Sequence, residues 1–269
     1  MKAENWTILT GATGGLGKAF LDELMSKNKN VIICGTSNQK LEQLKNLYIN
    51  NNSKIVCYAF NLADTNQILQ FAEFVKTNNF CVNTLINNAG FITEGSIEYS
   101  PYSNFTNAID VNCKGTILLT KLILDLNNYK NTNIITISSL ASNYPMPYMS
   151  VYSATKSLLT SFFLSLRSEL KKNNVNVTIV EPGAIPTSKD MISAIKAQGF
   201  KGKLSSTSAQ KIAKISLIKN SKHKKFYTPG FVNKLTKVAS KITPKGLQMC
   251  VISKMWKKSQ EKRNIKWKF

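Results

Sequence analysis

The chain has 269 residues, of which 43% are hydrophobic, and this fits a globular α/β protein that needs neither a disulfide nor a metal to fold. No stretch approaches the roughly 18 apolar residues of a membrane-spanning helix, and the N-terminus lacks the apolar core of a signal peptide, so we expect a cytoplasmic protein whose membrane contact would be peripheral. The net charge of +22 is uneven: residues 201–269 contain 19 Lys and Arg and one acidic residue, against 17 and 13 in residues 1–200.

The first 180 residues alternate short β-branched runs with amphipathic segments. We expect strands at Trp6–Thr10, Val31–Cys34, Ile55–Ala59, Thr84–Asn87, Ile134–Ser138 and Val175–Val180. Between them we expect helices at Leu16–Lys27, Lys40–Asn50, Thr65–Asn78, Asp110–Leu126 and Val151–Lys172. This alternation predicts the α/β class: a single doubly wound parallel sheet, the Rossmann fold, with helices on both faces.

The pattern changes after Pro182-Gly183. A polar segment extends to Ser208, and a helix over Ala209–Ile218 and a short strand over Lys225–Thr228 follow. Two Lys-rich helical patterns, Phe231–Ile242 and Lys245–Lys258, complete the chain. We therefore predict one Rossmann domain over residues 1–230 and a basic helical C-terminal extension over residues 231–269.

A glycine-rich loop joins the first predicted strand to the first helix. Such a loop allows a tight turn and lets the backbone approach a pyrophosphate at the positive end of the helix. The strand before it and the helix after it are the context that this function requires. The residues that we expect to contact a dinucleotide here are Gly11, Thr13, Gly14, Gly15, Leu16 and Gly17.

The residues after the second predicted strand bear on the choice of cofactor. An acidic residue there would bind the ribose 2′-hydroxyl of NAD. The chain has Cys34-Gly35-Thr36-Ser37-Asn38 instead, with Lys40 nearby. Hydroxyl and amide groups can hydrogen-bond a 2′-phosphate, so Thr36 and Ser37 favour NADP(H) over NAD(H).

A tyrosine and a lysine four residues apart, Tyr152 and Lys156, lie in the fifth predicted helix and on the same face of it. A tyrosine hydroxyl titrates near pH 10, and a neighbouring ammonium lowers the pKa of a phenol, which suits Tyr152 to proton transfer. Ser139, at the end of the fifth predicted strand, lies at the edge of the sheet where ligands bind in this fold.

These residues together resemble the short-chain dehydrogenase/reductase family. Its TGxxxGxG loop is matched by Thr10, Gly11, Gly15 and Gly17, its NNAG motif by residues 87–90, and its PG motif by Pro182 and Gly183. Its catalytic tetrad is matched, in order and spacing, by Asn112, Ser139, Tyr152 and Lys156. The resemblance covers roughly residues 5–230. The loop that runs into Tyr152–Lys156 also looks like that of long-chain 3-oxoacyl reductases and hydroxysteroid dehydrogenases.

The resemblance implies an oxidoreductase that moves a hydride between a nicotinamide and a carbonyl or secondary alcohol. Ser139 and Tyr152 would bind the substrate oxygen, Tyr152 would transfer the proton, Lys156 would tune Tyr152 and hold the nicotinamide ribose, and Asn112 would position a water. It also implies a homo-oligomer. Further cofactor contacts would come from Asn61, Leu62, Asn88, Ala89, Gly90, Pro182, Gly183 and Thr187.

The chain departs from the family at two positions. The family's aspartate near the adenine is replaced by Asn61, and a glycine three residues after the catalytic serine is replaced by Ser142. Because the tetrad is intact, we expect an active enzyme. The alternative is a catalytically silent nucleotide-sensing protein that acts through its basic tail.

The loop between Ser139 and Tyr152 is rich in Met, Tyr and Pro, which suit an irregular apolar ligand, and Tyr144 is a candidate substrate contact. The same composition also fits a purely structural loop.

The basic extension, residues 231–269, is open to four interpretations. Its amphipathic helices could lie on an anionic membrane surface, or they could cap the fold or a subunit interface. Its charge could steer acidic substrates. Nucleic acid binding is the weakest interpretation, because no recognised module accompanies the lysines.

Overall fold

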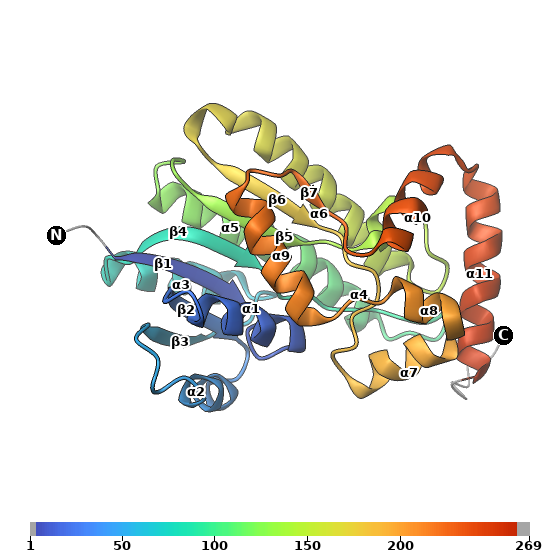
Figure 1. Ribbon diagram of the computed structural model, residues 1–269, viewed down its shortest axis with the longest axis horizontal. Helices are drawn as coiled ribbons and strands as arrows, with labels where there is room; N and C mark the ends of the chain where they lie inside the picture. Colours follow the sequence, from blue (N-terminus) through green and yellow to red (C-terminus); the bar gives the residue numbers. More distant parts are fainter. Residues whose placement is uncertain (1–3, 263–269) are drawn as a thin grey trace.

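The structure, a computed structural model, describes residues 4–262 (Figure 1). Seven parallel strands form one sheet in the order β3-β2-β1-β4-β5-β6-β7. The strands are β1 (Asn5–Thr10), β2 (Asn30–Gly35), β3 (Ile55–Ala59), β4 (Cys81–Asn87), β5 (Asn133–Ile137), β6 (Asn176–Val180) and β7 (Phe226–Tyr227). The predicted doubly wound sheet is confirmed.

Helices cover both faces of the sheet. They are α1 (Gly15–Met25), α2 (Asn38–Asn46), α3 (Thr65–Thr77), α4 (Tyr102–Ile109), α5 (Thr116–Leu126), α6 (Ser150–Glu169), α7 (Lys189–Ala197), α8 (Gly199–Ser205), α9 (Ala209–Ser221), α10 (Phe231–Ile242) and α11 (Lys245–Lys262). The core on one face includes residues of α1, α2 and α9, and the cores on the other face include residues of α3, α5 and α6.

Alternate strand residues supply the cores on the two faces. In β1, Ile8 packs with α3 and α5, whereas the next residue, Leu9, packs with α1 and α9. In β2, Ile32 and Ile33 divide in the same way. All four side chains are fully buried. A strand buried on both faces is apolar along most of its length, which explains why the sequence pattern identified these strands.

The sheet fixes where a ligand can bind. Its strand order reverses beside β1, since β2 lies on one side of β1 and β4 on the other. In open α/β sheets, this switch point leaves a crevice beyond the carboxyl ends of the strands. The glycine loop, the Asn87–Gly90 segment, Ser139 and Pro182-Gly183 all follow the carboxyl ends of strands, so the fold gathers them at one edge.

Three sequence expectations are corrected. The helix expected to begin at Asp110 is preceded by α4 and joined to it through a π-helical turn over Asp110–Gly115. The polar segment before Ser208 contains α7 and α8, which are only 9 and 7 residues long and too short for a sequence pattern to identify them. β4 also begins three residues earlier than expected, at Cys81.

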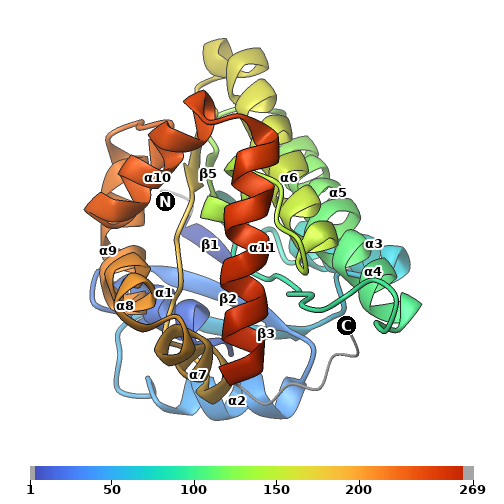
Figure 2. The ribbon, with the colours of Figure 1, turned by 90° about the vertical axis from the view of Figure 1, so that its right-hand side faces the viewer.

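The C-terminal helices lie at the carboxyl end of the sheet. In Figure 2, α11 crosses in front of this edge, and α10 lies beside it. Trp256 of α11 is buried against Met146 and Met149 of the loop before α6. No helix among residues 4–262 is both long enough and apolar enough to cross a membrane. The boundary between a domain and an extension at residue 230 stays a prediction.

Candidate active site

A cavity of about 660 Å³ opens at the carboxyl edge of the sheet. Most of the predicted site residues line it: Gly11, Thr13, Gly14, Gly15, Leu16, Gly17, Thr36, Asn61, Leu62, Asn88, Ala89, Gly90, Ser139, Tyr152, Lys156, Pro182, Gly183 and Thr187. Of the predicted residues, all of which lie in the described range, Ser37, Asn112 and Tyr144 are outside this lining. The fold thus brings residues from six loops to one hollow.

The glycine loop can bring its backbone close to a ligand because its glycines have no side chains. Gly11 has φ of +63°, and a Cβ there would lie 2.9 Å from the Cα of Ala89. A Cβ on Gly17 would lie 2.1 Å from the carbonyl oxygen of Gly11. Gly14 has room, and it precedes the first turn of α1, where backbone N–H groups favour an anion. The loop therefore fits the pyrophosphate of a dinucleotide.

Asn88 and Thr10 brace this loop. The Asn88 Nδ2 donates to the carbonyl oxygens of Thr10 (2.9 Å) and Gly11 (3.0 Å). The Thr10 Oγ1 accepts from the backbone N–H groups of Asn88 and Ala89, each at 3.0 Å. The Asn88 side chain, predicted to contact the cofactor, thus hydrogen-bonds the protein at the wall of the cavity.

Ser139, Tyr152 and Lys156 face the cavity together. Ser139 caps the turn Leu140–Asn143, and its Oγ accepts from the N–H of Ala141 at 3.1 Å. Burial raises the pKa of Tyr152, and a hydrogen bond with Ser139 opposes that rise. The sequence led us to expect the pKa of Tyr152 to be lowered by Lys156, and the opposite direction is found because desolvation of the phenolate dominates.

Lys156 is buried, with 4% of its surface exposed. Its Nζ donates to the carbonyl oxygen of Ile137 at 2.8 Å and lies 5.8 Å from the centre of the Tyr152 ring. Burial lowers the pKa of Lys156 to about 8, because the ammonium loses its hydration. This group therefore changes charge near physiological pH.

Asn112 lies behind the cavity in the π-helical turn. Its Oδ1 accepts from the N–H of Phe91 at 2.7 Å, and its Nδ2 donates to the Phe91 carbonyl oxygen at 2.9 Å and to the Thr155 Oγ1 at 3.1 Å. A Cβ on Gly90 would lie 3.5 Å from both the Asn112 Oδ1 and the Lys156 Nζ. The amide is thus fixed close to Lys156. A π-helical turn is often found at a functional site.

The part of the cavity that follows β2 and β3 contains Thr36 and Asn61, where the sequence predicts the adenosine. Asn61 Oδ1 accepts from the N–H of Ala63 at 2.9 Å and so shapes its own loop. Ser37 is the N-cap of α2, where its Oγ accepts from the N–H of Lys40. Ser37 therefore has a structural partner that the sequence analysis did not assign.

Ser142, which replaces the family's glycine, joins the serine turn to a buried carboxylate. Its Oγ donates to the Ser139 carbonyl oxygen at 2.7 Å and lies 3.5 Å from the Glu181 Oε1. Glu181 is fully buried and forms an ion pair with Lys237 of α10. Glu181 is the residue before Pro182, which lines the cavity. The sequence analysis did not identify it, because a single Glu after a strand matches no motif.

An apolar cluster lies on the Tyr152 side of the cavity. Tyr152 packs against a group of aromatic and sulfur-containing side chains from the loop before α6 and from α11, with Tyr144 among them. Burial raises the pKa of Tyr144 to about 12, so it stays neutral. The members of the cluster are Ala141, Tyr144, Met146, Tyr148, Met149, Tyr152, Ile252, Met255 and Trp256.

Several cavity residues escaped sequence reasoning. They belong to no recognised motif, although Phe91 and Ile92 directly follow the Asn87–Gly90 motif and could have been inferred from it. Others, on α4 and α7, depend on helices that the sequence did not indicate. These cavity residues are Phe91, Ile92, Asn107, Val111, Ala184, Ile185 and Met191.

Comparison with known sequences gives consistent matches. A family model described as short chain dehydrogenase matches residues 5–197. Dehydrogenase/reductase SDR family member 7B of Mus musculus is 30% identical over 209 residues, which cover 76% of this chain and 64% of that protein. Very-long-chain 3-oxoacyl-CoA reductase of Neurospora crassa is 29% identical over 198 residues, which cover 71% and 59%. The matches thus span less than two thirds of these relatives.

Comparison with solved structures supports the fold. A 7β-hydroxysteroid dehydrogenase structure superposes with a TM-score of 0.80, covering 94% of this chain and 98% of that chain, at 18% identity. At this identity the similarity establishes the fold alone, and the evidence for a reaction has to come from the residues of the site.

Proposed function

This chain belongs to the short-chain dehydrogenase family, and from that premise we propose that it is an NADP(H)-preferring oxidoreductase that interconverts a carbonyl and a secondary alcohol. The observation that carries the proposal is the placement of Ser139, Tyr152 and Lys156 on one cavity whose other end is the glycine loop. A bound nicotinamide supplies or accepts the hydride, which is chemistry that no side chain offers.

The residues of the chain would bind the substrate and move the proton. Ser139 Oγ and Tyr152 Oη would hydrogen-bond the substrate oxygen and stabilise the charge that develops on it. The Tyr152 Oη would give its proton to that oxygen during reduction and take one during oxidation. Lys156, as an ammonium, would favour the phenolate when it forms and would hold the nicotinamide ribose. Asn112 would keep the Phe91 backbone and Thr155 in position and would bind the water that links Lys156 to solvent.

The cofactor would be held by the backbone of the glycine loop at its phosphates and by Thr36, with Ser37 beside it, near the ribose. The absence of an acidic residue from Gly35 to Asn38 supports a 2′-phosphate. The other cofactor contacts would be those of the cavity lining, Asn61, Leu62, Asn88, Ala89, Gly90, Pro182, Gly183 and Thr187.

The substrate would be lipophilic, of the 3-oxoacyl or hydroxysteroid type. The apolar cluster around Tyr152, with buried Met146, Met149 and Trp256, supports this class, because thioether and aromatic groups offer dispersion contacts and few hydrogen bonds. The name of the Neurospora relative, a very-long-chain 3-oxoacyl-CoA reductase, points the same way.

The test begins with fluorescence titrations of NADPH and NADH, followed by turnover of 3-oxoacyl thioesters and keto-steroids. Tyr152→Phe should lower turnover by about 100-fold or more while NADPH binding persists. Tyr102→Phe, which removes the same hydroxyl from an 82% exposed site, should change neither. Undiminished turnover in Tyr152→Phe, or failure to bind either nucleotide, would contradict the proposal and favour the silent sensor.

Cofactor preference has a separate test. Thr36→Asp should weaken NADPH binding and favour NADH, since a carboxylate repels the 2′-phosphate and binds a ribose hydroxyl. Thr77→Asp, at the exposed end of α3, adds the same charge elsewhere and should leave the preference unchanged. A preference that shifts equally in both variants would mean that Thr36 has no particular role.

A further inference from the structure

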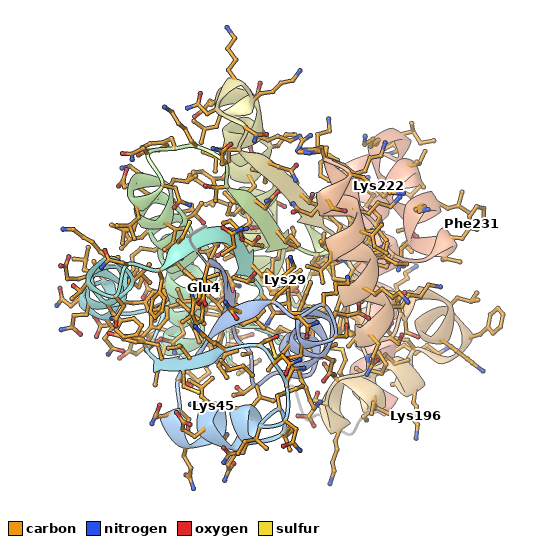
Figure 3. All side chains as sticks on the ribbon, turned by 60° about the vertical axis from the view of Figure 1, so that its left-hand side comes forward. Glu4, Lys29, Lys45, Lys196, Lys222 and Phe231 are labelled. Atoms are coloured by element: carbon orange, nitrogen blue, oxygen red, sulfur yellow. The ribbon has the colours of Figure 1, made fainter. Side chains whose placement is uncertain are left out.

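Helix α10 turns its apolar face to the solvent and its polar face to the protein. Its apolar residues recur at positions 231, 235, 238 and 242, which lie on one face of a helix. All are exposed: Phe231 by 74%, Leu235 by 54%, Val238 by 61% and Ile242 by 81%. The side chains buried against the protein are polar, with Asn233 fully buried and Ser240 only 8% exposed. Figure 3 shows Phe231 pointing away from the rest of the molecule.

Polar contacts fix this orientation. Asn233 Nδ2 donates to the carbonyl oxygens of Ser205 (2.9 Å) and Pro229 (2.7 Å). Lys237 forms an ion pair with the buried Glu181. Turning the helix over would bury lysines and leave that carboxylate without its partner, which is costly in a protein interior. The outward apolar face is therefore held in place by the same contacts that attach α10 to the fold.

Charge indicates what covers this face. Lys234 and Lys241 are exposed beside it, and Lys245 follows at the start of α11. The sequence contains no acidic residue from 231 to 260. A second copy packed on α10 by two-fold symmetry would bring these lysines against each other. A bilayer with anionic headgroups offers both hydrocarbon for the apolar residues and negative charge for the lysines.

Exposed apolar side chains also lie on the neighbouring helices. Phe200 and Leu204 of α8, which α10 contacts through Asn233, are 76% and 44% exposed. Leu247 and Val251 of α11 are also exposed. A row of exposed large apolar side chains like that on α10 is uncommon on a soluble monomer and marks an interaction site.

We propose that the face of α10 formed by Phe231, Leu235, Val238 and Ile242, with Lys234 and Lys241 beside it, docks the protein on an anionic lipid surface. This inference does not depend on the proposed catalytic activity. The ion pair of Lys237 with Glu181, next to Pro182 at the cavity, would hold the cavity at a fixed position relative to that surface.

The test is sedimentation of the full-length protein with vesicles of phosphatidylcholine alone and of phosphatidylcholine with phosphatidylserine. We expect binding to the anionic vesicles, weakened by salt, and at least about tenfold weaker binding to neutral ones. Leu235→Gln with Val238→Gln, and separately Lys234→Gln with Lys241→Gln, should each weaken anionic binding by about tenfold or more.

Matched controls distinguish binding through this face from nonspecific adsorption of the protein to vesicles. Leu47→Gln with Ile49→Gln removes two exposed apolar side chains beside α2, at the opposite end of the molecule from α10 (Figure 1). Lys171→Gln with Lys172→Gln removes two exposed charges after α6. Both should bind vesicles like the wild type. Circular dichroism and NADPH titration of every variant would identify any that misfolds.

Three outcomes would overturn the proposal. The wild type would remain in the supernatant with anionic vesicles, or the α10 variants would bind as well as their controls. In the third outcome, light scattering without vesicles would show that the α10 variants convert a dimer to a monomer, which would assign the face to a second copy of the chain. Loss of catalytic turnover alone would leave the docking result unaffected.

Discussion

The central sheet and α10 bury opposite kinds of residue. Ile8, Leu9 and Ile32 are fully buried on the two faces of the sheet. In α10 the buried residue is Asn233, and the phenyl ring of Phe231 is exposed. An amphipathic pattern identifies which residues share a face, but the contacts of the folded chain decide which face turns inward. The sheet buries mainly apolar side chains, whereas α10 buries polar ones and pairs its Lys237 with the buried Glu181.

We expect the largest effect from breaking the ion pair that joins α10 to the end of the sheet. Glu181→Gln leaves the mostly buried Lys237 ammonium without a charged partner, so we expect the free energy of unfolding to fall by about 3 kcal/mol or more. Chemical denaturation measures this loss. Adding Lys237→Met should recover much of it, because the unpaired charge is then removed.

Glu4→Gln serves as the control for the Glu181 experiment. It breaks the exposed pair with Lys54, whose side chain is 62% exposed, and should change stability far less. If the two variants were equally stable, or if Lys237→Met gave no rescue, the buried pair would not be what fixes α10 against the sheet.

The next largest effect is the pH dependence of the stability that Lys156, at the carboxyl edge of the sheet, contributes. Burial lowers the pKa of Lys156 to about 8, so between about pH 8 and 10.5 the unfolded chain binds this proton and the folded chain does not. Stability from this group therefore rises with pH across that window. We expect the wild type to gain up to about 3 kcal/mol relative to Lys156→Met between pH 7.5 and 10.5, by chemical denaturation of the free protein. A difference that stays constant with pH would contradict the burial of a titrating lysine.

The sequence predicted the fold and much of the site for a physical reason. Strands buried on both faces are apolar along most of their length, and glycines such as Gly17 stand where a Cβ would meet backbone. The sequence could not indicate that Asn112 lies in a π-helical turn, because such a turn has no periodic signature. The direction of the Tyr152 pKa shift was also missed, since burial is a property of the assembled fold. The roles assigned to the site residues and the homo-oligomeric state stay predictions.

We expect the smallest effect from a pair of substitutions that compares α11 with α10. Trp256 of α11 packs into the apolar cluster beside Tyr152, whereas Phe231 of α10 points outward. Trp256→Phe should lower the free energy of unfolding by about 1–2 kcal/mol, because the smaller ring leaves a gap in the cluster. If the proposed substrate packs against this cluster, kcat/KM for a bulky apolar ketone should fall by about tenfold, with little change for a small ketone that would not reach it. Phe231→Leu also reduces an aromatic side chain but should change neither quantity. Denaturation and steady-state kinetics with both ketones measure the four values. Equal losses in the two variants would mean that α10 packs inward as α11 does, and the contrast between the sheet and α10 would no longer hold.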